Sequence, residues 1–182
     1  MNFLESIDPK NPSLILYLLE PGNIRASNTE IISRVEKAGY KTIVITMNFP
    51  SSVLEKLYAQ KGINTENIYY IDAISASSLG KPPAEDGRHL SVNNPGDLTS
   101  LSIAITKAIK KMDKNKIFIL LDSISSMLIY IPSLKTVKFI HLLTNKIRQI
   151  NYSGALLAIE GGLDPMILAQ VSSFVDEVVT EG

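Results

Sequence analysis

Short, continuous runs of apolar residues recur along the chain, and segments with a helical pattern separate them. The runs lie at residues 14–19, 42–47, 68–71, 117–122, 155–159 and 174–179. A run that is apolar on both faces is typical of a strand buried inside a parallel sheet. The segments between them place apolar residues at helical spacing, as Val137, Ile140 and Leu143 do within 134–150. This alternation predicts an α/β fold, a three-layer α/β/α sandwich with a mostly parallel sheet of about six strands.

A chain of 182 residues falls within the range that one such sheet with its helices fills. We therefore expect a single domain over residues 1–182, with an irregular lead-in at 1–12. Residues 73–97 are rich in glycine and proline and show neither a helical nor a strand period. A loop of about 25 residues is uncommon in a compact domain and is usually functional. It is a candidate element for contact with a partner.

Helix starts are indicated by capping patterns. Ser27 with Glu30, and Ser52 with Glu55, match the Ser-x-x-Glu box. The first box predicts a helix from about residue 28 to residue 38, and the second a helix that ends near residue 62. Asp97 is predicted to begin a further helix, which fades in a group of lysines.

Composition excludes several classes of function. Eighteen basic residues balance eighteen acidic ones, so no net charge attracts a polyanion or an anionic membrane. The lysines at 107, 110, 111, 114 and 116 are interpreted as a solvated helix end, and binding of nucleic acid is not expected. No cysteine is present, and His89 and His141 do not have ligand spacing, so no metal site is predicted from them.

The cellular location follows from two further features of the sequence. The N-terminus has no signal-peptide pattern, and the apolar runs are far shorter than the roughly 20 residues of a membrane helix. We expect a cytoplasmic protein that does not enter the membrane.

Ligands in parallel α/β sheets bind at the carboxyl ends of the strands, which directs attention to two segments. The turn at 20–27 offers Gly22, Arg25 and Ser27, where a phosphate-binding loop needs several glycines, a lysine and a hydroxyl group. The alternative is a plain turn before a helix cap. The run 117–122 delivers Asp122, followed by Ser123, to a strand end, as in a magnesium-binding Walker B segment. The alternative there is an aspartate that caps the following turn.

The order of these segments, with Ala155-Leu156-Leu157-Ala158-Ile159-Glu160 and 174–179, resembles the KaiC branch of the RecA-type ATPases. The stretch 94–99 is similar to uncharacterised archaeal KaiC-related domains. The resemblance covers nearly the whole chain. It implies that the strand at 174–179 lies at one edge of the sheet, followed by those at 14–19, 155–159, 117–122, 42–47 and 68–71. It also implies that a nucleotide site would lie at Gly22, Arg25, Ser27, Asp122 and Ser123, with Asp122 as the magnesium ligand.

The departures from this family indicate lost chemistry. The segment 20–27 lacks the glycine-rich pattern and the lysine, and Asn48 stands where the family has its general-base glutamate. An amide does not accept a proton from water near neutral pH, and the missing lysine removes charge that stabilises phosphoryl transfer.

Three functions follow from this comparison. We expect a non-catalytic RecA/KaiC-like interaction or regulatory module that binds no cofactor and associates with itself or with a related ATPase. One alternative is a residual ATP-binding protein that uses Arg25 and Asp122 with magnesium. The second alternative is a nucleic-acid-binding domain like the recombinases.

Overall fold

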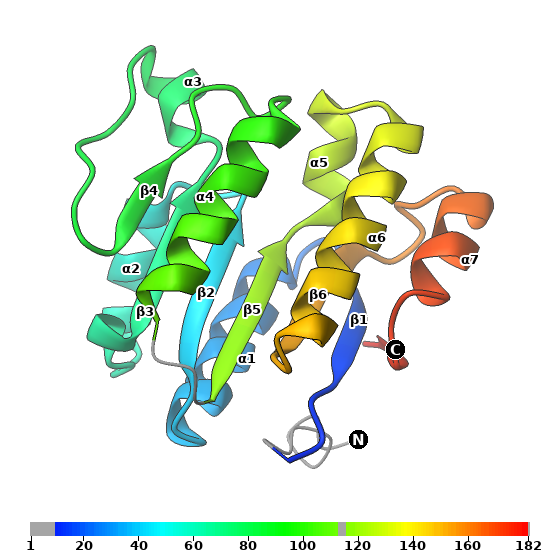
Figure 1. Cartoon of the computed structure of the whole chain (residues 1–182), viewed down its shortest axis with the longest axis horizontal. Coiled ribbons are helices and arrows are strands. Elements are labelled where there is room, and N and C mark those ends of the chain that lie inside the picture. Colours follow the sequence, from blue (N-terminus) through cyan, green and yellow to red (C-terminus); the bar gives the residue numbers. More distant parts are fainter. Residues whose placement is uncertain (1–9, 113–115, 182) are drawn as a thin grey trace.

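A computed structural model describes residues 10–112 and 116–181, and a seven-stranded sheet with helices on both faces runs through them (Figure 1). The strands are β1 (Leu14–Leu19), β2 (Lys41–Thr46), β3 (Ile68–Asp72), β4 (His89–Ser91), β5 (Ile117–Asp122), β6 (Ser153–Ile159) and β7 (Glu177–Thr180). The helices are α1 (Ile24–Lys37), α2 (Ser51–Gln60), α3 (Ser75–Leu79), α4 (Leu98–Lys111), α5 (Ile124–Tyr130), α6 (Ser133–Gln149) and α7 (Pro165–Ser172), with a 3-10 turn at Thr65–Asn67.

The sheet has the order β4-β3-β2-β5-β6-β1-β7, and its paired strands are all parallel. The α/β class and the relative order of the six expected strands are confirmed. The strand β4 was not predicted and extends the sheet beyond β3. Its three residues lie within the segment 73–97, where so short a strand leaves no visible period.

The strands are apolar on both faces because each face packs against its own layer of helices. On one face Ile119 joins a core with Leu101 of α4 and Ile140 of α6. On the other face Phe118 joins a second core with Ile32 of α1 and residues of α2. Since consecutive strand residues point to opposite faces, this arrangement requires continuous apolar runs.

The first helix starts earlier than the sequence pattern indicated. α1 begins at Ile24 rather than near residue 28, and Ser27 lies inside its first two turns instead of capping it. Ile24 is buried, and the packing of its side chain favours a helix that already includes residues 24–27. The capping box predicted at this position is therefore wrong.

The second helix also lacks the predicted box. α2 begins at Ser51, after Pro50, and no side chain from its own segment caps it. The carboxylate of Asp72, at the end of β3, accepts a hydrogen bond of 2.7 Å from the Ser51 amide instead. A residue distant in sequence thus satisfies an amide that a local cap usually satisfies.

Several other boundaries follow the sequence closely. Asp97 caps α4, as expected, by accepting a hydrogen bond from the Ser100 amide. The last strand begins at Glu177, three residues later than predicted, because residues 173–176 form a turn. Most of the predicted lead-in, residues 1–9, lies outside the described residues, as does the lysine at 114. In the described parts of the chain, no helix has the length and apolar character needed to span a bilayer.

Candidate functional site

Asp122 ends β5 near the middle of the sheet, and its carboxylate is enclosed by protein. The residue has no solvent exposure. Its Oδ2 accepts a hydrogen bond of 2.7 Å from Asn28 Nδ2, and its Oδ1 accepts one of 3.4 Å from Asn48 Nδ2. Burial raises the pKa of Asp122 to about 6, although the hydrogen bonds from the two amides oppose this rise. Both oxygens that would face a magnesium ion therefore already have partners.

Asn28 links Asp122 to a second buried side chain. The Tyr58 hydroxyl of α2 donates a 2.5 Å hydrogen bond to Asn28 Oδ1, while the Asn28 amide group donates to Asp122. Burial raises the pKa of Tyr58 well above its ordinary value, so the hydroxyl stays a donor. The hydrogen-bonded side chains of Tyr58, Asn28 and Asp122 connect α2, α1 and β5. Asn28, in the middle, uses both its amide oxygen and its amide nitrogen.

Ser123 caps the helix α5, whereas the sequence alternative assigned the capping of this turn to Asp122. Its hydroxyl accepts a 3.1 Å hydrogen bond from the Ser126 amide at the start of α5 and lies 3.0 Å from the Ser126 hydroxyl. The side chain is fully buried. Ser123 therefore stabilises α5 and does not face an open site.

The turn after β1 carries the other predicted residues, and a carboxylate from the far end of the chain contacts it. Ser27 donates a hydrogen bond of 2.8 Å to Glu181 Oε1, and the Glu20 amide donates one of 3.4 Å to Glu181 Oε2. β7 runs parallel to β1, so Glu181, directly after β7, reaches the turn. This acidic side chain uses donors that a phosphate would need.

Gly22 and Arg25 are both exposed, and neither contacts Asp122 in this structure. Gly22 has open space where a side chain would start, with no atom within 4 Å. Arg25 lines a cavity of about 500 Å³ between α1 and α2, together with Lys61 and other residues. Asp122 does not line that cavity. The structure therefore does not bring the predicted cation and the predicted metal ligand to one place.

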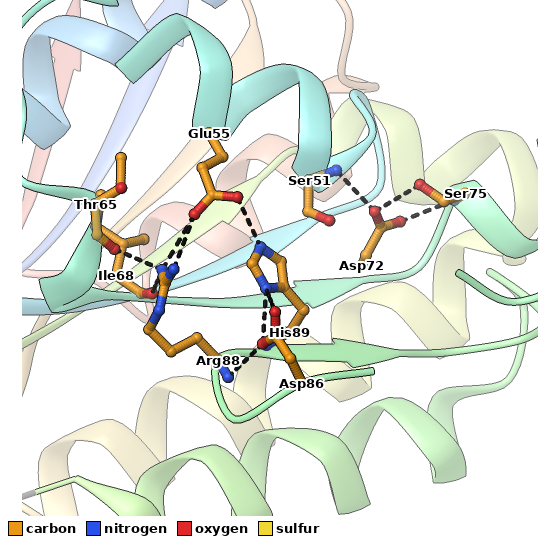
Figure 2. Close-up of polar contacts among 9 residues, drawn as sticks. All are labelled: Ser51, Glu55, Thr65, Ile68, Asp72, Ser75, Asp86, Arg88 and His89. Atoms are coloured by element: carbon orange, nitrogen blue, oxygen red, sulfur yellow. Dashed lines mark hydrogen bonds and ion pairs between the residues drawn. The ribbon is translucent and has the colours of Figure 1, made fainter. Parts of the chain in front are cut away.

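A separate polar cluster fixes the segment before β4 (Figure 2). His89 lies between two carboxylates, with Nε2 3.2 Å from Glu55 Oε2 and Nδ1 2.8 Å from Asp86 Oδ2. Its ring is stacked on the ring of Tyr70 of β3, with the two ring centroids 4.8 Å apart. Arg88 donates to the Thr65 carbonyl oxygen at 2.7 Å and lies 3.2 Å from Glu55 Oε1. The predicted loop 73–97 is therefore anchored on α2 and β3.

Two aspartates near β3 and β4 have depressed pKa values. Burial alone would raise the pKa of Asp72, but hydrogen bonds from Ser75 and Ser51 hold it below its ordinary value. Burial also acts to raise the pKa of Asp86, but hydrogen bonds from Arg88 and His89 together outweigh it and hold the pKa at about 2. Across residues 10–112 and 116–181, no three His, Asp or Glu side chains are grouped closely enough to hold a metal ion.

Comparison with known proteins identifies the family. The model of a family of unknown function, DUF7504, matches residues 30–181. The chain belongs to the DUF7504 family. A search of curated proteins finds no match to it.

Two solved structures from the archaeon Pyrococcus horikoshii are similar to this DUF7504 member in fold. One is the uncharacterized protein PH0321, crystallised in complex with an unknown peptide, at 14% identity and a TM-score of 0.69, over 92% of this chain and 76% of that protein. The other is the KaiC-like protein PH0186, at 14% identity and a TM-score of 0.62, over 92% of this chain and 70% of that protein. The mostly parallel sheet and its flanking helices thus share the fold of these two structures, one of them a KaiC-like protein.

Sequence reasoning missed two residues of the candidate site, Asn28 and Glu181. Asn28 interrupts a stripe of apolar residues at 24, 31, 32 and 35, and a polar residue in such a stripe indicates a buried hydrogen-bond partner. The wrong helix start concealed this signal. Glu181 is brought to the turn only by the pairing of β7 with β1, which gives no local signal in the sequence.

Proposed function

We propose that this chain is a non-catalytic RecA/KaiC-like domain that acts as an interaction or regulatory module. The observation that carries the proposal is the burial and hydrogen bonding of the Asp122 carboxylate. A magnesium-binding carboxylate needs at least one oxygen directed at the metal or at a bound water. Here the carboxylate has no solvent exposure, and both oxygens accept hydrogen bonds from the side chains of Asn28 and Asn48.

The turn after β1 supports the same proposal from the phosphate side. Binding of a triphosphate depends on positive charge and free amide groups. The segment 20–27 contains no lysine, and the Glu181 carboxylate accepts hydrogen bonds from the Ser27 hydroxyl and the Glu20 amide. A phosphate at this position would have to displace a like charge.

A domain of this fold that has lost its nucleotide chemistry still has surfaces that can pack against other proteins, which agrees with an interaction role. The neighbour PH0321 was crystallised with an unknown peptide, so a protein of this fold binds polypeptide. For this chain we propose protein partners, either further copies of itself or a related ATPase. Nucleic acid is a less favoured partner because the described lysines of the group at the end of α4, 107, 110, 111 and 116, are accompanied by no exposed aromatic platform.

Titration calorimetry with Mg-ATP tests the loss of nucleotide binding. We expect no saturable heat from the purified chain. The rival function, residual ATP binding through Arg25 and Asp122, predicts saturable heat that disappears in Asp122→Ala but persists in Glu160→Ala. Glu160 is an exposed acid that follows β6 at the same edge of the sheet, which makes it a matched control.

The interaction role has its own readout. Light scattering coupled to gel filtration measures the mass of the chain in solution, alone and with candidate partners. A concentration-dependent increase in mass supports self-association. A fixed monomer mass directs the search to other proteins.

A further inference from the structure

An apolar hollow on the described surface lies between α4 and α6. It has a volume of about 710 Å³, and residues of both helices line it. Lys146 of α6 donates a 2.5 Å hydrogen bond to the Thr106 hydroxyl of α4, which ties the two helices together beside it. Both helices cover the same face of the sheet (Figure 1). We call this hollow the α4/α6 groove.

The apolar lining of the α4/α6 groove is partly open to solvent. Leu142 is 68% exposed and Ile103 is 51% exposed, and Leu98 and Phe139 complete the apolar lining. Single exposed apolar residues are ordinary on protein surfaces. Apolar residues that gather in a hollow between two helices instead indicate a surface that another molecule covers.

The rim of the groove is basic. Lys107 and Lys110 of α4 and Lys135 and Lys138 of α6 line it, and no acidic residue does. None of the four forms an ion pair with an acidic residue among those described. The chain as a whole has no net charge, so this concentration is local. The lysines of α4, interpreted from sequence as a solvated helix end, thus flank an apolar surface.

We propose that the α4/α6 groove binds an amphipathic, acidic helix of a partner protein. This inference rests on the proposed interaction role and names its surface. An apolar stripe of the partner helix would cover Leu142 and Ile103, and carboxylates on both sides of the stripe would face the four lysines. α4 has 14 residues and is about 21 Å long at 1.5 Å per residue, so a partner helix of about four turns matches the groove.

The described helices of this chain do not supply such an occupant, which argues against a second copy. Acidic residues occur in α1 and α2, at Glu30, Glu36 and Glu55. Glu30 pairs with Arg34 and Glu55 pairs with Arg88, so neither helix has an acidic face. Nucleic acid is disfavoured for a different reason. Phe139, the aromatic side chain in the lining, is only 6% exposed and offers no stacking surface for a base.

Fluorescence anisotropy with the full chain tests the proposal. The probe is a labelled helical peptide of about four turns with a leucine stripe flanked by glutamates, and the control peptide carries lysine at each glutamate position. We expect saturable binding of the acidic peptide only, weakening as ionic strength rises. Leu142→Ser and the double variant Lys107→Glu, Lys138→Glu are expected to weaken binding at least about tenfold.

Matched controls separate the groove from general surface effects. Met166 is 71% exposed on α7, so Met166→Ser removes a comparable apolar side chain elsewhere. Lys56 is an exposed lysine on α2, so Lys56→Glu changes the charge on the opposite face. Both controls are expected to bind the acidic peptide like the unmodified chain.

Several results would overturn the proposal. They are absence of saturable binding by the acidic peptide, equal binding of the lysine peptide, or equal loss in the control variants. Lysine-dependent binding of single-stranded DNA or of anionic vesicles in preference to the peptide would assign the groove to another class of ligand. None of these results bears on the heat of the Mg-ATP titration. The proposed groove can therefore be refuted while the proposed non-catalytic role still holds.

Discussion

Replacing Asp122 by asparagine is expected to stabilise the fold at neutral pH. Burial raises the pKa of Asp122 from 3.8 to about 6. The folded chain therefore holds this proton more tightly than the unfolded chain does. The contribution of the group to stability is full below about pH 4 and is lost as the pH rises through 6. Above that pH the fold carries a buried charge that the unfolded chain exposes to water.

The magnitude follows from the two pKa values. A rise from 3.8 to about 6 corresponds to about 3 kcal/mol, at 1.36 kcal/mol for each pKa unit. Asparagine has nearly the same shape, and its carbonyl oxygen can still accept the hydrogen bond from Asn28. Its amide group would face Asn48, which is only partly buried and can turn its own amide oxygen toward it. We therefore expect Asp122→Asn to raise the free energy of unfolding by up to about 3 kcal/mol above pH 7. The gain should shrink below pH 6 and disappear near pH 4.

Urea denaturation at a series of pH values measures this difference. The slope of the free energy with urea concentration should be the same in both proteins, because the folded structure is retained. Glu160→Gln, which removes an exposed carboxylate at the same sheet edge, is the control and should change little. A variant that is no more stable than the original at pH 7.5, or a difference that does not depend on pH, would show that the ionised Asp122 does not destabilise the fold.

The opposite pH dependence is expected for Asp72. Hydrogen bonds from Ser75 and other groups lower the pKa of this carboxyl group. Its contribution is present above pH 4 and lost as the pH falls, so Asp72→Asn should cost about 1–3 kcal/mol at neutral pH and less in acid. The same denaturation series checks this, and a variant as stable as the original at pH 7 would contradict it. Gly154→Ala would place a methyl group 2.7 Å from the Ile119 carbonyl oxygen, so we expect a loss of more than about 2 kcal/mol in calorimetric unfolding. Gly22→Ala, with open space around it, should change stability by less than about 0.5 kcal/mol, and similar effects at both glycines would contradict the packing of β6.

The sequence predicts the sheet well because each buried strand needs an uninterrupted apolar run. Six strands and their order are confirmed, and β4 was missed because three residues at a sheet edge need no such run. Helix starts were less predictable. α2 takes its cap from Asp72, and the start of α1 depends on the burial of Ile24, so neither depends on the neighbouring serine.

The site was predicted less completely than the fold. Asp122 lies at the expected strand end, but nothing near it in sequence shows that Asn28 and Asn48 bind both of its oxygens. Likewise, the contact of Glu181 with Ser27 arises from strand pairing between the two ends of the described chain. Contacts of this kind depend on tertiary structure, and local patterns do not encode them.

A crystal structure of this chain grown with saturating Mg-ATP would show whether the chain has lost its nucleotide site. We predict that Asp122 keeps its hydrogen bonds to Asn28 and Asn48, that Glu181 keeps its contact with Ser27, and that no nucleotide occupies the turn at 20–27. A triphosphate bound by that turn, with the Asp122 carboxylate released from Asn28 and directed at a magnesium ion, would contradict the account.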